Sequence, residues 1–473
     1  MSIWKPGLLA AACALLAACA PMPKLGAPAS ELDATRTGLA ANARPAEPRP
    51  QGAAWWQAWQ APELDQLIER ALAESPSLAS AQARIARASA AAEAAGAAEG
   101  PALGAGVELT RQRFTEHGLY PAPLAGSVRD VGTLQLGLSY EFDFFGRHSA
   151  ALAAAVGRQR AAQADAEAAR LLLSSRVARA YIELARSLAQ TRLLDEQLQQ
   201  REQLLALVRQ RAEAGLDTRQ EQRQNELPVH ELKRQRLQYE EQSQAMRLQL
   251  AALTVQSPET LKDLAPSLPQ PLALDAAQAP GIDLLGRRPD IVAARWMAEA
   301  GRQQVRQARA QFYPNVSLSA FAGFNAIGLD RVLEIGSRQA GVTPALHLPL
   351  FDSGRLSAQL KGAAADADAA VATYNATLLD AVRDVNEQLL GLRSLQAQQR
   401  EQQAQLAKTR ELQGLAEQRA SAGLSSRASV LSAQLQTLAQ QRQQLDLQAQ
   451  TVLAEVGVLR SLGGGWSEQD ARP

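Results

Sequence analysis

The sequence is poor in several kinds of residue, and each shortage narrows what the protein can be. Only two cysteines occur, Cys13 and Cys19, both within the first twenty of 473 residues. A disulfide framework in the rest of the chain is therefore excluded. No run of 18 apolar residues follows Cys19, which excludes a transmembrane helix there. If this chain crosses a membrane, it must do so with strands.

Neither the net charge nor the spacing of reactive side chains indicates nucleic-acid binding, a metal site or catalysis. Lysine and arginine number 49 against 48 acidic residues, so the net charge of +1 gives no electrostatic footprint for nucleic acid. None of the histidines stands at ligand spacing from Cys, His or a carboxylate; they are His117, His148, His230 and His347. We find no phosphate loop and no convergent nucleophile and base. We therefore expect no enzyme activity, no metal and no cofactor.

The N-terminus is typical of an exported protein. Residues 1–18 begin with a charged stretch followed by a short apolar run, which predicts a signal peptide. The residues just before Cys19 resemble a bacterial lipoprotein signal, so Cys19 is the expected lipidated first residue; an ordinary signal with an incidental cysteine is the alternative. Ala20 favours the outer membrane over inner-membrane retention. Residues 19–60, rich in Pro, Ala and Arg, predict an extended lipidated segment.

Aromatic residues make up only 4% of the chain, and Ala, Gln, Leu and Arg dominate, a composition that favours long packed helices. One short stretch occurs twice: residues 211–216 read RAEAGL and residues 419–424 read RASAGL. Each copy separates two long stretches almost free of helix breakers, and Gly accepts the positive φ of a tight turn. We therefore predict two long helical hairpins with tips at 211–219 and 419–427.

Other landmarks repeat in the same order, with an offset of 213 residues at two prolines and of 208 from the second Gly-Arg pair onward, which predicts an internal duplication with one five-residue deletion. Pro76 and Pro101 are 25 residues apart, and so are Pro289 and Pro314. Gly-Arg pairs at 146–147 and 354–355 have the same 208-residue offset as the tips. The predicted regions are a first repeat at 61–253, a linker at 254–286, a second repeat at 287–462 and a C-terminal tail at 463–473.

Each repeat has the pattern helix, strand, strand, long helix, helix. The helices are expected at 77–99, 148–213 and 218–253, and at 290–311, 356–421 and 426–461. The strands are expected at about 102–115 and 131–145, and at 315–327 and 341–351. From Leu134 to Phe144 apolar residues alternate with polar or small ones, as in a strand with one apolar face.

Strands of this length suit a membrane-spanning wall, although an amphipathic strand in a soluble sheet is the alternative. Four strands cannot close around an open interior, so the wall needs further copies of the chain. In the long helices, apolar residues at 4-3 spacing predict coiled-coil contacts; they are Val177, Tyr181, Leu184 and Leu188, and Leu378, Val382, Val385, Leu389 and Leu392.

Several stretches together resemble the TolC-like outer-membrane efflux channel family, in its lipoprotein branch of multidrug-efflux outer-membrane factors. They are Arg287–Ile291 followed by Ala293–Arg295, Ala308–Pro314, Leu348–Arg355, and Tyr140–Asp143 with Gly146 and Arg147. The resemblance implies a mainly α fold with a small β part. It also implies a homotrimer whose twelve-stranded transmembrane β-barrel continues as a periplasmic α-helical barrel.

As to function, the resemblance implies the outer-membrane component of a tripartite efflux pump, a passive exit duct for drugs and other small toxic compounds. Its expected partners are a periplasmic adaptor (membrane fusion) protein, an inner-membrane transporter of the RND type, and outer-membrane lipid through acylated Cys19. A type I protein-secretion channel and a pore-less, lipid-anchored coiled-coil scaffold are the alternatives. The lipoprotein signal and the mid-chain signature favour efflux of small compounds.

The resemblance also assigns roles to the two tips. The adaptor-docking residues are expected to be Ala214, Gly215 and Leu216, and Ala422, Gly423 and Leu424. Members of the family often carry acidic pore-constricting residues just beyond the second tip, where this chain has Ser429 and Ser432. These two serines, with Asp217, Arg219 and Glu221 at the first tip, are the candidates for the pore gate. We expect a weaker block by cations than in relatives with acidic rings.

Overall fold

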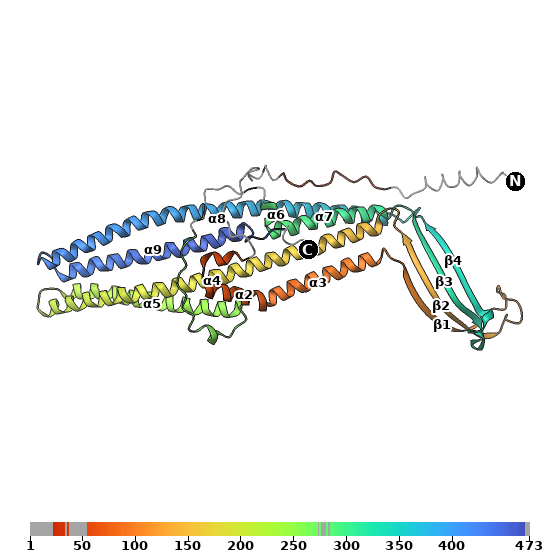
Figure 1. Ribbon diagram of the computed structural model, residues 1–473, viewed down its shortest axis with the longest axis horizontal. Coiled ribbons are helices and arrows are strands. Elements are labelled where there is room, and N and C mark those ends of the chain that lie inside the picture. The colour runs from red at the N-terminus through yellow and green to blue at the C-terminus, as the bar shows by residue number, and fades with distance from the viewer. Residues whose placement is uncertain are drawn as a thin grey trace. The chain divides into compact units, whose positions relative to one another are not determined.

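The computed structural model describes residues 22–33, 36, 54–272, 274–275, 281 and 284–468. Its elements occur in two matching series (Figure 1). The first series is α3 (Pro76–Ala97), β1 (Ala102–Arg113), β2 (Val128–Phe142), α4 (Arg147–Glu213) and α5 (Arg219–Leu253). The second is α7 (Pro289–Ala310), β3 (Asn315–Ile327), β4 (Arg338–His347), α8 (Arg355–Ser421) and α9 (Arg427–Ser461). Corresponding helices have equal lengths of 22, 67 and 35 residues.

Shorter elements precede, join or interrupt the two series. They are η2 (Trp55–Trp59), α2 (Pro62–Glu74), η3 (Pro258–Leu261), α6 (Leu284–Arg287), η4 (Leu329–Arg331) and η5 (Ile335–Ser337). The chain forms two compact units, and the long helices α4 and α8 contribute to both.

The first unit contains an antiparallel sheet in the order β1-β2-β3-β4, shown side by side in Figure 1. The register of the strands aligns their apolar residues in rows across one face. One such row is Leu103, Leu138, Ala320 and Val342. The predicted alternation is thus continuous across four strands, and the sheet has one apolar face and one face of mainly polar and small residues.

Two strand predictions were displaced toward the following helix. The strand predicted at 131–145 is β2, Val128–Phe142, and the one predicted at 341–351 is β4, Arg338–His347. The alternation of apolar and polar residues continues beyond the end of each strand. There, however, an aspartate carboxylate accepts a hydrogen bond from an amide in the first turn of the following helix, and the strand ends. Asp143 accepts from the Ser149 amide at 2.8 Å, and Asp352 accepts from the Leu356 amide at 2.7 Å. The other boundaries agree with prediction to within two residues; β1, for example, ends at Arg113 instead of 115.

The second unit is helical, and its core joins residues far apart in the sequence. Trp55, Trp56 and Trp59 pack with α2, α4, α5 and α9 in one cluster that includes Tyr181 and Val456. The predicted 4-3 positions form buried seams: Val177, Leu184, Leu378, Val385 and Leu392 are each 0% exposed. Among the described helices, none combines the length and the apolar content needed to cross a membrane.

The segments before, between and after the two repeats also contain ordered structure. Trp55–Trp59, within the predicted segment 19–60, form a 3₁₀ helix, while residues 22–33 are irregular. Leu272, in the linker predicted at 254–286, donates its amide to the buried Glu455 carboxylate at 2.9 Å. In the predicted C-terminal tail, the Glu468 amide donates to the Gly286 carbonyl at 3.1 Å. Cys19 lies outside the described residues.

Candidate functional site

Both repeated stretches end a long helix with the same backbone turn. Gly215 has φ +75° and Gly423 has φ +73°. The amide of the following leucine donates to a carbonyl five residues back, Leu216 to Arg211 and Leu424 to Arg419, each at 2.8 Å. This left-handed helix ending favours glycine because a side chain is strained at positive φ. The sequence predicted these turns correctly from the glycines.

The turns present an apolar side chain to solvent. Leu216 is 68% exposed and Leu424 is 72% exposed. A Cβ added to Gly215 or Gly423 would have no atom within 4 Å, so the space beside each turn is open. The tips therefore combine an exposed leucine with room for the close approach of another surface.

The returning helices begin with side-chain caps that differ between the tips. At the first tip, the Thr218 hydroxyl accepts from the Glu221 amide at 3.2 Å, and Glu221 accepts from the Thr218 amide at 2.7 Å. This reciprocal capping box satisfies two amides that have no helical partner. At the second tip, Ser426 accepts from the Ser429 amide at 3.3 Å, and their hydroxyls lie 3.0 Å apart.

The first tip also carries an ion pair that the second lacks. Arg211 binds Asp217 through two hydrogen bonds of 2.9 Å, and these bonds lower the pKa of Asp217. At the second tip the residue equivalent to Asp217 is Ser425. Among the described residues, no carboxylate lies within ion-pair distance of Arg419. An ion pair therefore stabilises the turn of the first tip but not the turn of the second.

Four of the five gate candidates form hydrogen bonds within their own tip or the helix that follows it. Asp217 pairs with Arg211, Glu221 caps its helix, and Arg219 is exposed. Ser429 contacts Ser426, while Ser432 donates to the Ala428 carbonyl at 2.9 Å. All five residues lie within the first two turns beyond a tip, where their links to neighbouring copies stay a prediction.

Sequence reasoning missed a polar layer that joins the two hairpins further along the helices. Arg442 of α9 donates to Gln190 and Gln197 of α4 at 3.0 and 3.2 Å, and to Gln235 of α5 at 3.1 Å. Gln190 is fully buried and donates back to the Arg442 carbonyl at 2.9 Å. Nearer the tips, Leu204 packs against Leu431 and Leu435. No local sequence signal marks this layer, because its partners are more than 200 residues apart.

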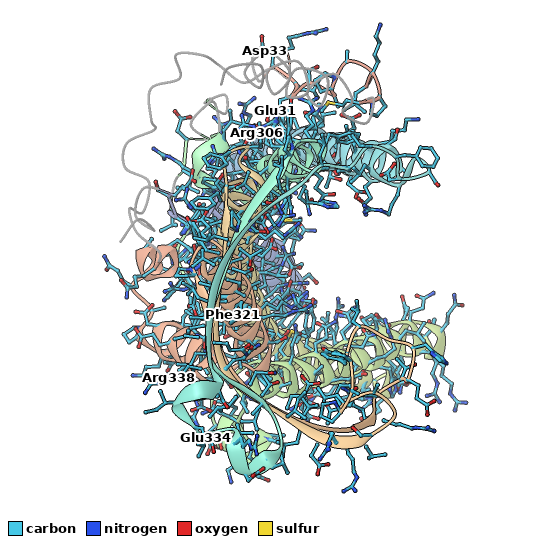
Figure 2. The ribbon with its side chains drawn as sticks, turned by 90° about the vertical axis from the view of Figure 1, so that its right-hand side faces the viewer. Glu31, Asp33, Arg306, Phe321, Glu334 and Arg338 are labelled. Carbon is cyan, nitrogen blue, oxygen red and sulfur yellow. The ribbon has the colours of Figure 1, made fainter. Side chains whose placement is uncertain are left out.

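In the first unit, the polar face of the sheet carries one large aromatic ring in its middle rows. Phe321, labelled in Figure 2, lies in register between Gly137 and Gly341. A Cβ on Gly341 would lie only 2.7 Å from the Phe321 ring, so the ring covers this glycine. The adjacent residues of this face are Ser319 and Gly323 on β3. Apart from Phe321 and the pair Val131 and Ile327 at one end, the side chains of this face are polar or small.

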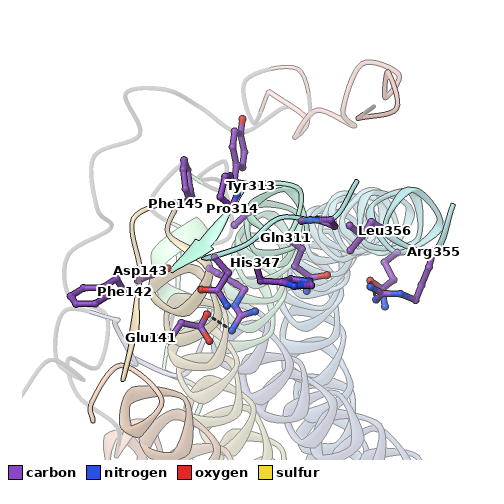
Figure 3. A pocket seen from close by; sticks show the side chains of 15 residues that line it. Glu141, Phe142, Asp143, Phe145, Gln311, Tyr313, Pro314, His347, Arg355 and Leu356 are labelled. Carbon is purple, nitrogen blue, oxygen red and sulfur yellow. Dashed lines mark hydrogen bonds and ion pairs between the residues drawn. The ribbon is translucent and has the colours of Figure 1, made fainter. Parts of the chain in front are cut away.

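A hollow of about 360 Å³ lies where the strands meet the helices (Figure 3). Inside it Glu141 pairs with Arg147, and its carboxylate lies 2.9 Å from Nε2 of His148. Phe145 and Tyr313 also line the hollow, and their rings stack with centroids 4.7 Å apart (Figure 3). The lining therefore combines charged and aromatic side chains. Within the described residues, no cluster of His, Cys, Asp or Glu is suited to a metal.

Comparison with known proteins identifies the family. The family model described as "Outer membrane efflux protein" matches residues 67–255 and 282–464, one segment for each repeat. The chain belongs to the outer membrane efflux protein family. The multidrug resistance outer membrane protein MdtP of Shigella flexneri is 32% identical over 473 residues, covering 96% of this chain and 94% of that protein. The fusaric acid resistance protein FusA of Burkholderia cepacia is 36% identical over 358 residues, covering 74% of this chain and 67% of FusA.

Solved structures agree with this assignment. The outer membrane protein VceC of Vibrio cholerae is 36% identical with a TM-score of 0.79, covering 88% of this chain and 99% of VceC. The outer-membrane channel OprN is 26% identical with a TM-score of 0.80, covering 95% of this chain and all of OprN. The protein is therefore an outer-membrane efflux channel that extends into the periplasm, with the duplicated, mainly helical fold predicted from its sequence.

Proposed function

We propose that three copies of the chain form a passive exit duct through which a tripartite pump expels small toxic compounds. The matched apolar face of the sheet supports this proposal most strongly. A four-stranded sheet whose apolar residues align in rows is suited to lipid on one side and a water-filled passage on the other. A pore-less scaffold has no use for such a face.

The edges of the sheet explain why several copies are needed. β1 and β4 are the outer strands, so each leaves a row of backbone amides and carbonyls without a partner in the same sheet. In lipid each unsatisfied group is costly, so the edges must pair. Pairing β4 of one copy with β1 of the next, through three copies, closes twelve strands and leaves no edge.

The tips supply the docking surface for the periplasmic adaptor, which connects the duct to an inner-membrane transporter of the RND type. Leu216 and Leu424 offer apolar contacts, and the flanking Ala and Gly residues let a partner helix approach closely. Lipidation at Cys19 would attach the chain to the outer membrane. The relatives named for multidrug and fusaric acid resistance favour small compounds over exported proteins as cargo.

Replacing both tip leucines tests docking and efflux together. Each leucine contributes about 1.5–3 kcal/mol when fully buried, so Leu216→Ser with Leu424→Ser weakens adaptor docking by a factor of ten or more. We expect a deletion strain to be hypersensitive to toxic dyes and antibiotics, and wild type but not the double variant to restore resistance. Growth inhibition is the measurement.

The matched control is Leu237→Ser, an exposed leucine of α5 away from the tip. It should restore resistance fully, and both variants should reach the outer membrane as trimers. Full resistance with the tip double variant would exclude docking through these leucines. A deletion strain with unaltered sensitivity to every compound tested would contradict the proposed efflux of small molecules.

A further inference from the structure

The connection between β3 and β4 folds back onto the apolar face of the sheet. Its first residue, Gly328, donates its amide to the Asp130 carbonyl of β2 at 2.7 Å, which ties the connection to the neighbouring strand. The Val332 and Leu329 side chains then lie over Gly132: a Cβ there would be 2.6 Å from Val332 Cγ2 and 3.3 Å from Leu329 Cδ2. Gly132 therefore makes the space that this connection occupies.

The same connection exposes more apolar surface. Leu329, Leu333 and Ile335 are 50%, 75% and 76% exposed. Charged residues alternate with them, among them Asp330, Arg331 and Glu334, which is labelled in Figure 2. Short amphipathic segments of this kind lie at membrane interfaces, with apolar side chains in the acyl region and charged ones toward the headgroups.

The dimensions of the sheet show why such a supplement is needed. From Phe142 to Leu134 the strand rises about 27 Å, at about 3.4 Å per residue. At a tilt of about 40° this covers only about 21 Å of membrane, less than the apolar band of about 25 Å that a membrane wall requires. In the next row Gly132, which has no side chain, lies between Leu109 and Ala326. The row after it holds the charged pair Arg111 and Asp130, 3.8 Å apart. Leu329 and Val332 cover Gly132 and so add apolar side chains to its row.

We propose that the segment Leu329–Ile335 inserts its apolar side chains among the acyl chains of the outer leaflet and so completes the lipid-facing band. This rests on the proposed membrane-spanning sheet, because the segment continues its apolar face. Arg338, the charged side chain that shares a row with Leu134, lies beside the segment, where its long side chain can reach the headgroups (Figure 2).

The test places an environment-sensitive probe on single cysteines. Leu333→Cys, Glu334→Cys and Leu136→Cys are labelled with a nitrobenzoxadiazole dye and reconstituted as trimers into phosphatidylcholine vesicles, with the wild-type protein as labelling background. At 333 and 136 we expect acyl-brominated phosphatidylcholine to remove more than about half of the emission, as for a dye in the hydrocarbon region. At 334, aqueous iodide should quench strongly and brominated lipid weakly.

Position 136, in the middle of the apolar face, separates the two proposals. If it is quenched by lipid and 333 is quenched only by iodide, the segment is not in the membrane and the inference is wrong. If the dye at 333 is shielded from both quenchers, a second copy of the chain covers the segment, and this result would also contradict its insertion into lipid. If 136 itself is not quenched by lipid, the membrane-spanning sheet fails.

A second variant asks whether Gly132 holds the segment in place. Gly132→Val brings a side chain into the space of Val332 and Leu329, so it should displace the segment. In this background the dye at 333 should become open to iodide, whereas the dye at 136 keeps its lipid quenching. Unaltered lipid quenching at 333 in intact trimers would overturn the role of Gly132.

Discussion

Removing the Arg288 guanidinium should loosen the junction of three helices. Arg288 is 9% exposed and lies just before α7. It donates to Asp290 at 2.6 and 3.1 Å, to Asp384 of α8 at 3.3 Å, and to the carbonyl of Ser461 in α9 at 2.9 Å. Its pKa is raised because these acceptors outweigh the cost of burial.

The size of the effect follows from what Arg288→Ala leaves behind. Asp384 keeps two bonds from Arg460, at 3.0 and 3.1 Å, but the fully buried Ser461 carbonyl loses the Arg288 donor. Leaving a buried carbonyl without its donor costs about 1–3 kcal/mol. At about 1.4 kcal/mol per factor of ten, local opening should become about 5 to 150 times more frequent.

Hydrogen exchange followed by mass spectrometry in the purified trimer measures how often the backbone amides at this junction become exposed. Peptides covering 284–294 and 455–462 should exchange about 5 to 150 times faster in Arg288→Ala than in wild type. The control is Arg383→Ala, which removes exposed pairs of 3.1 and 3.5 Å on α8. Its exchange should change by a few-fold at most, because exposed pairs are weak. Equal exchange in the two variants would refute the stabilising role of the Arg288 network.

Three further predictions concern the tips and the sheet. Channels in planar bilayers should be insensitive to divalent cations, because Ser429 and Ser432 carry no charge; strong block at micromolar concentrations would contradict this. Because the pKa of Asp217 is lowered, its ion pair contributes above the unfolded pKa and is lost as pH falls through the folded one. A spin label on Leu216→Cys should therefore gain mobility only below about pH 4, whereas a label on Leu424→Cys should show no such step. Gly341→Val should displace the Phe321 ring and reduce the yield of heat-resistant trimers on gels, while Gly336→Val, in open space, should not.

Much of this fold could be predicted because its signals are local and repeated. Glycine at each tip, the alternation of β2 and the 4-3 seams depend on backbone geometry that a few neighbouring residues decide. The duplication doubled every such signal, so α4 and α8 could be aligned by their Gly-Arg starts and their glycine tips alone. The strand ends were less predictable, since Asp143 and Asp352 stop strands whose alternating pattern continues.

The sequence by itself thus determined the periodic parts of this protein: two hairpins, two pairs of strands and two exposed tip leucines. Tertiary structure decided how those parts are joined. Arg442 meets Gln190 across 252 residues, Arg288 meets Ser461 across 173, and Val332 covers a glycine of a strand from the other repeat. These contacts have no period and no fixed spacing along the chain. They arise only when folding brings distant polar and apolar groups together, which is why only the three-dimensional arrangement shows them.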